Sequence, residues 1–214
     1  MTAGFDLKEG SYIRKEYTAS ELWDSLETIF TNKSRNDTSY KYGYLISLIK
    51  SFCDIDPEGK LTFDQIFMRF SEIYWNLVSV YGIMQKKITK DGRAAAIDRI
   101  ILNVKYERKF YQDEKFTNLD INTQSEILNK VKENCKKYVI GAVFEDTNRC
   151  FYDFSKKEEY IKLNPQMMDL ILKNKVVVTH MTLYSWARFL ESINTGTSST
   201  GIIEKLESSV GEMP

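Results

Sequence analysis

Histidine is the rarest catalytic residue type in this chain, which has 214 residues and a single histidine, His180. One imidazole excludes histidine-rich metal sites and His–Cys–Cys zinc clusters, and nothing in the sequence marks a nucleophile for a hydrolytic triad. We interpret His180 as a polar residue at the start of an amphipathic helix, although a Cys–His pair stays open. The sequence therefore has no recognisable catalytic centre. Whether the protein is an enzyme stays open, and the sequence favours a protein that is not one.

Cysteines and long apolar runs are also scarce. Cys53, Cys135 and Cys150 are odd in number and widely spaced, which favours reduced, buried thiols over a disulfide framework. Charged residues interrupt every apolar stretch before it reaches the length of a membrane span. The first ten residues lack the apolar segment of a secretory signal. We therefore expect a cytoplasmic protein with no membrane partner.

Net charge is absent as well, because 30 basic and 30 acidic residues cancel. The balanced net charge creates no overall electrostatic potential that would attract a nucleic acid or a membrane. Any such binding must come from a local patch of charge. Lys90-Asp-Gly-Arg93 lacks the second glycine and the Lys-Ser/Thr of a phosphate-binding loop, and we expect no cofactor.

Helical spacing dominates the apolar pattern. Its longest stripe runs from Phe63 to Tyr81, and capping-box signatures at Thr18–Glu21 and Thr123–Glu126 predict two helix starts. Asn164-Pro165 predicts another, with Asn as the N-cap and Pro in the first turn. These signals indicate a mainly α protein.

A change of pattern predicts a small β element. Tyr138–Phe144 and Cys150–Phe154 are rich in β-branched and aromatic residues around a turn, and Tyr160–Leu163 adds a third short strand. The predicted fold is a helical domain with a small β-hairpin or three-strand insertion near residues 138–163. We expect one domain over residues 1–194, followed by a flexible linker and a short C-terminal tail over 195–214.

The segment Asp54–Gln65 partly matches a calcium-binding EF-hand loop. Asp54, Asp56 and Glu58 occupy ligand positions, but Gln65 stands where a bidentate Glu should close the site. No second loop completes a pair. We predict an ordinary inter-helix turn and no metal, with these three carboxylates as weak candidates.

Basic residues concentrate in one region and alternate with the aromatic side chains of Tyr106, Phe110 and Tyr111. Such a mixture can hold a phosphate backbone and stack on bases, whereas a solvated face is the alternative. A second group comprises Lys130, Lys132, Lys136 and Lys137. The candidate nucleic-acid-binding residues are those of the first group: Lys86, Lys87, Lys90, Arg93, Arg99, Lys105, Arg108 and Lys109.

Segments spread over residues 20–206 resemble the N-terminal helical region of bacterial HNH endonuclease-type proteins. Thr38–Ile49 resembles the "SYKF…LL.LL" helix of that family, and Leu61–Phe70 with Ile73-Tyr-Trp75 resembles its next helix. Leu183–Asn194 resembles the "W..FLE..N" helix, and Ile202–Leu206 the approach to the nuclease domain. The nuclease histidines of that family follow this region, so the resemblance assigns no catalytic residue. It implies either a protein that is only the helical part or a nuclease supplied by another chain.

Three functions remain open from the sequence. The first is a non-catalytic DNA-binding or specificity module associated with a restriction or phage-defence nuclease. The second is a subunit that docks a partner protein through exposed aromatic residues and the C-terminal tail. The third is a metal-dependent nuclease with an unrecognised carboxylate site.

Overall fold

The computed structural model describes residues 6–31, 38–86, 94–109, 114–194 and 199–211. It is mainly helical, with 66% helix, eight helices and a four-stranded antiparallel sheet among these residues, which confirms the predicted fold class. In order, the strands and α-helices are β1 (Glu9–Gly10), α1 (Ala19–Glu27), α2 (Tyr40–Lys50), β2 (Lys60–Thr62), α3 (Phe63–Trp75), α4 (Ala96–Glu107), α5 (Ile121–Asp146), β3 (Tyr152–Ser155), β4 (Tyr160–Leu163), α6 (Pro165–Lys173), α7 (Lys175–Ile193) and α8 (Ser199–Val210).

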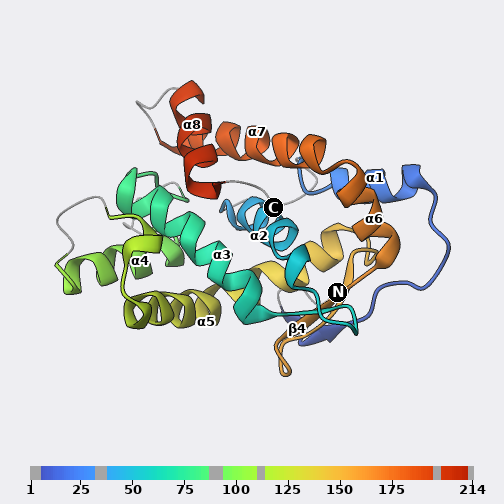
Figure 1. Cartoon of the computed structure of the whole chain (residues 1–214). Helices are drawn as coiled ribbons and strands as arrows, with labels where there is room; N and C mark the ends of the chain where they lie inside the picture. Colours follow the sequence, from blue (N-terminus) through green and yellow to red (C-terminus); the bar gives the residue numbers. More distant parts are fainter. Residues whose placement is uncertain (1–5, 32–37, 87–93, 110–113, 195–198, 212–214) are drawn as a thin grey trace.

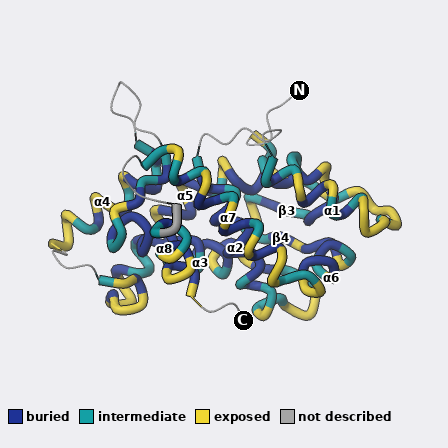
Figure 2. The backbone as a smooth tube through the Cα atoms, turned by 90° about the horizontal axis from the view of Figure 1, so that it is seen from above, coloured by how far each residue is buried: buried dark blue, intermediate teal, exposed yellow. Residues whose placement is uncertain are grey.

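Helices α2 and α3 form the centre of the core. Nearly every residue of α2 is buried, as the dark tube in Figure 2 shows. The ring of Tyr74 on α3 fills the space where a side chain on Gly43 would stand, so glycine lets the two helices approach closely. Tyr74 also lies 4.4 Å from Phe70 and 5.3 Å from Trp186, measured between ring centroids. Burial of such large rings is the main stabilising contribution in this region.

The helix starts follow local capping chemistry. The Thr18–Glu21 capping box is present at α1, and the Asn164 side chain accepts a hydrogen bond from the Gln166 backbone, with Pro165 in the first turn of α6. The expectation for Thr123–Glu126 was wrong, because α5 begins earlier and Asp120 is its N-cap. Thr123 lies within the first turn and donates its hydroxyl to Asp120.

The sheet joins segments that are distant in sequence, in the order β1-β3-β4-β2. Strands β3 and β4 form the hairpin, whose inner residues Phe154 and Ile161 are buried against the helices. The predicted strand at Tyr138–Phe144 is wrong, since these residues continue α5. Its buried residues Val139, Ile140, Val143 and Phe144 recur at helical spacing, and their burial outweighs the strand preference of β-branched side chains.

The C-terminal segment packs on the core. Residues 195–198 of the predicted linker lie outside the described residues, whereas Ser199 already begins α8. Ile202, Leu206 and Val210 are buried, and α8 lies beside α7 in Figure 1. Lys50 of α2 donates to the backbone carbonyl of Val210, so this segment is joined to the centre of the core.

Candidate nucleic-acid interface

Helix α4 carries the described part of the first basic group. Ile97, Ile101 and Val104 are fully buried and fix one face of the helix against the core. The opposite face exposes Arg99, Leu102, Asn103 and Tyr106, which follow helical spacing. Tyr106 is the most exposed of the large hydrophobic side chains in the described residues, at 86%. Figure 1 shows α4 at one end of the molecule, away from the strands.

Two basic residues follow Tyr106 at the end of α4. Lys109 has a backbone φ of 55°, donates its N–H to the Tyr106 carbonyl and exposes its side chain. Arg108 is exposed too, but its guanidinium donates to Glu126 at 2.7 Å. This hydrogen bond raises the pKa of Arg108, and the ion pair offsets its charge. Lys109 therefore offers a more accessible charge than Arg108.

The remaining predicted residues are placed differently. Lys105 is half-buried, and its ammonium donates to the backbone carbonyl of Ser79, so it holds α4 to the preceding segment. Lys86 is half-buried as well. Lys87, Lys90 and Arg93 lie outside the described residues. Among the described candidates, Arg99 is exposed on the helical face that carries Tyr106, and Lys109 is exposed just after the helix ends.

A buried carboxylate that the sequence did not single out lies beneath this face. Asp98 is fully buried and accepts hydrogen bonds from the backbone N–H of Gln85 at 3.1 and 3.2 Å. Burial raises the pKa of Asp98 to about 7, although hydrogen bonds from the Gln85 and Ala95 backbones act to lower it. Asp98 thus joins the start of α4 to the segment around Gln85.

Polar side chains extend this buried network into the core. Ser39 donates its hydroxyl to Gln85 at 2.7 Å, and the Tyr74 hydroxyl donates to the Ser39 carbonyl at 3.0 Å. The Ile97 N–H at the first turn of α4 donates to the Tyr40 hydroxyl at 3.1 Å. Helix α4 is therefore held by specific hydrogen bonds in addition to apolar contacts, which gives its outer face a fixed orientation.

Three of the four lysines in the second basic group form ion pairs, whereas the fourth, Lys137, is exposed with its ammonium 4.8 Å from the centroid of the Tyr138 ring. Lys132 is only 7% exposed and contacts Asp64 at 2.6 Å and Glu159 at 2.9 Å. Lys136 contacts Glu133 at 2.7 Å and Glu159 at 2.6 Å. Lys130 contacts Glu126 at 2.7 Å. Lys132 and Lys136 connect α5 with the β3–β4 turn, and Lys132 also contacts the start of α3, which is a structural role.

The EF-hand-like segment uses its carboxylates within the fold. Asp54 pairs with Arg69 at 2.6 Å, and Asp56 accepts from the backbones of Glu58 and Lys60. Gln65 closes a capping box at the start of α3 and donates its amide to the Asp54 carbonyl at 3.1 Å. The segment is a turn leading into β2. Across the described ranges, no group of three or more His, Cys, Asp and Glu residues could hold a metal ion.

The histidine and the cysteines differ in their exposure. His180 is exposed on α7, whereas Cys135 and Cys150 are buried and Cys53 is exposed. All three thiols are unbridged. Desolvation raises the pKa of Cys135 to about 12, so this thiol is an unreactive core residue at neutral pH.

No protein-family model, curated protein or solved structure matches this chain. None of the described helices has the length and apolar composition needed to cross a membrane.

Proposed function

We propose that this protein is a non-catalytic nucleic-acid-binding module that contacts its ligand through the outer face of α4. The observation that carries the proposal is the 86% exposed ring of Tyr106, on the same helical face as Arg99 and next to the exposed Lys109. A water-exposed aromatic ring between two cations is the combination that stacks on bases and contacts phosphates.

The charges around α4 favour an anionic ligand. Glu107, the carboxylate nearest to this face along the helix, lies 3.8 Å from Lys130, and Glu126 pairs with Arg108. Asp98 lies on the buried side of α4 and does not reach the surface. The exposed cations for which no ion pair is described here are therefore Arg99, on the Tyr106 face, and Lys109, just after the helix, and a phosphate chain would release counterions when it binds them.

The resemblance to the N-terminal region of HNH endonuclease-type proteins supports an association with a restriction or phage-defence nuclease. In this proposal the module binds DNA, and a separate chain supplies cleavage. The two parts of the proposal can be tested separately, because DNA binding by α4 does not depend on the identity of the nuclease.

Fluorescence anisotropy with labelled DNA, single-stranded and duplex, tests the binding. We expect the affinity of the wild-type protein to fall steeply with salt. The double variant Arg99→Glu, Lys109→Glu should bind at least about tenfold more weakly, and the slope of log K against log salt should decrease by about 2. Both side chains are exposed, so folding should be unchanged.

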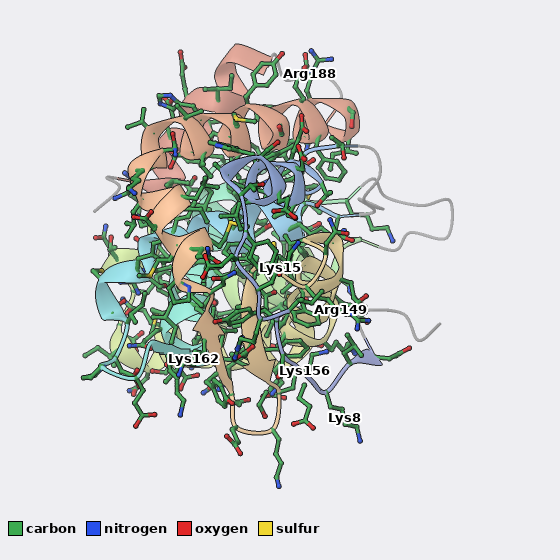
Figure 3. The ribbon with its side chains drawn as sticks, turned by 90° about the vertical axis from the view of Figure 1, so that its right-hand side faces the viewer. Lys8, Lys15, Arg149, Lys156, Lys162 and Arg188 are labelled. Atoms are coloured by element: carbon green, nitrogen blue, oxygen red, sulfur yellow. The ribbon has the colours of Figure 1, made fainter. Side chains whose placement is uncertain are left out.

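The matched control reverses two exposed lysines elsewhere, Lys157→Glu and Lys162→Glu. Lys162 lies on β4, and Figure 3 shows it beside the strands in the lower part of the view. This variant has the same net charge as the α4 variant and should keep at least about half of the wild-type affinity. Equal losses in both variants, or binding that does not respond to salt, would contradict an α4 interface.

A further inference from the structure

The ring of Tyr106 is open to solvent on both of its faces. The residue is 86% exposed, and its ring makes no ring–ring or cation–ring contact among the described residues. Other tyrosines near the surface differ in this respect. The ammonium of Lys137 lies 4.8 Å from the centroid of the Tyr138 ring. Lys60 lies 5.1 Å from that of Tyr160. The protein thus covers one face of these two rings with its own cations and neither face of the Tyr106 ring.

The surface around Tyr106 is apolar on the helix and cationic at its two ends. Leu102 is 40% exposed and lies one turn before Tyr106, so the two side chains are neighbours. Arg99 is exposed two turns before Tyr106, and Lys109 is exposed just after the helix ends. At 1.5 Å per residue, Arg99 and Lys109 are about 15 Å apart along the chain axis. The site is therefore short, with one stacking position between two phosphate contacts.

An exposed ring distinguishes a single strand from a duplex. Each base of a duplex has both faces covered by its neighbours, so a side chain can stack on it only after the duplex is locally unstacked. The bases of a single strand expose their faces, and stacking on one aromatic ring strengthens binding by about tenfold. The exposure of Tyr106 therefore favours a single strand.

The number of accessible cations favours the same ligand. Proteins that bind a duplex take much of their affinity from phosphates, often through about 6–10 contacts. Arg99 and Lys109 are the exposed cations on and directly after α4 for which no ion pair is described. Helix α5 lies beside α4 (Figure 1), and on that side Arg108 and Lys130 both contact Glu126. These two cations are thus less available to a second phosphate chain.

We propose that the ligand of the α4 interface is a single-stranded nucleic acid, with one base stacked on Tyr106 and phosphates held by Arg99 and Lys109. The inference rests on the proposed function and adds the class of ligand to it. Leu102 extends the apolar contact to the neighbouring sugar or base. The alternative ligand is a duplex that takes α4 into its major groove, with Arg99 and Asn103 at the base edges.

Fluorescence anisotropy compares a labelled oligothymidylate of about 12 nucleotides with a duplex of about 12 base pairs at one salt concentration. The wild type should bind the single strand at least about tenfold more tightly. Tyr106→Ala should weaken single-strand binding about tenfold and duplex binding no more than about twofold, whereas Tyr106→Phe should behave like the wild type. The matched control Tyr184→Ala removes a 57% exposed ring from α7 and should change neither affinity.

The variant Tyr106→Trp reports stacking directly. Trp75 and Trp186 are fully buried and Trp23 is half-buried, so an indole at position 106 would be the most accessible one among the described residues. Oligothymidylate should quench the fluorescence of this variant in a saturable manner, and the duplex should not. Tyr184→Trp is the matched control and should show no saturable quenching. A purely structural role of Tyr106 would not produce this signal.

The outcomes separate this inference from the proposed function. Duplex binding as tight as single-strand binding, still weakened by Arg99→Glu, Lys109→Glu, would overturn the single-stranded ligand and leave the α4 interface in place. An equal loss of both ligands in Tyr106→Ala, or no quenching in Tyr106→Trp, would overturn it as well. A wild type that binds neither ligand would contradict the proposed function and this inference together.

Discussion

The two lysine-rich regions of this protein resemble each other in sequence but differ in structure. Arg99 is exposed on the face of α4 that carries Tyr106, and Lys109 is exposed just after α4 ends. On α5, Lys132 and Lys136 share Glu159 and are further paired with Asp64 and Glu133. The comparison teaches that a cluster of basic residues indicates a binding surface only where neighbouring carboxylates do not already bind them.

The acidic residues of the two regions differ in the direction in which their surroundings change the pKa. Asp98, on the buried side of α4, has a pKa raised to about 7 by burial. Glu159 beside α5 is also affected by burial, but hydrogen bonds from Lys132 and Lys136 and their positive charges bring its pKa below the ordinary value. The contribution of Asp98 to stability is thus greatest at low pH, and that of Glu159 is greatest above its ordinary pKa.

The largest effect should come from Asp98. Because its pKa is raised from 3.8 to about 7 on folding, its contribution to stability is fully present below pH 3.8 and is lost as the pH rises through 7. The free energy of unfolding should therefore fall by up to about 1.4 kcal/mol per pH unit over this interval. Asp98→Asn should remove this component, as urea unfolding at several pH values can show.

The control for this prediction is Asp56→Asn, which changes an exposed carboxylate in the turn before β2. It should keep the pH dependence of the wild type. The same pH dependence in the wild type and in Asp98→Asn would show that Asp98 is not the titrating group.

A smaller effect is expected from Lys132. Lys132→Met keeps the aliphatic packing but removes the ion pairs with Asp64 and Glu159, so the free energy of unfolding should fall by about 1–2 kcal/mol. Lys130→Met, on the exposed side of α5, should change it by no more than about 0.5 kcal/mol. Neither substitution should lower DNA affinity more than about twofold. A tenfold loss of binding in Lys132→Met without unfolding would mean that α5 belongs to the interface.

Much of the fold could be predicted because its signals are local. The Thr18–Glu21 box and the Asn164-Pro165 start depend on neighbouring residues, and the hairpin strands have a compact β-rich sequence. Tyr138–Phe144 was assigned incorrectly because its β-branched residues suit a strand, while their burial along one face of α5 decides the outcome. The pairings of β1 with β3 and of β2 with β4 join distant segments and have no local signal.

The candidate interface was predictable only in part. The alternation of basic and aromatic residues pointed to the region of α4, but which cations are accessible depends on three-dimensional neighbours. Lys105 contacts Ser79, and Arg108 contacts Glu126 across 18 positions of sequence. The role of Asp98 could not be inferred either, since burial alone changes the pKa of this carboxylate.

Photocrosslinking from α4 tests the central claim most directly. A photoreactive phenylalanine analogue at position 106 is compared with the same analogue at position 138, where Tyr138 is 47% exposed on α5 beside the second lysine group. With labelled DNA, the account predicts a covalent adduct from position 106 that disappears at high salt, and little or none from position 138. Crosslinking from position 138 alone, or equally from both positions, would contradict the assignment of the nucleic-acid interface to α4.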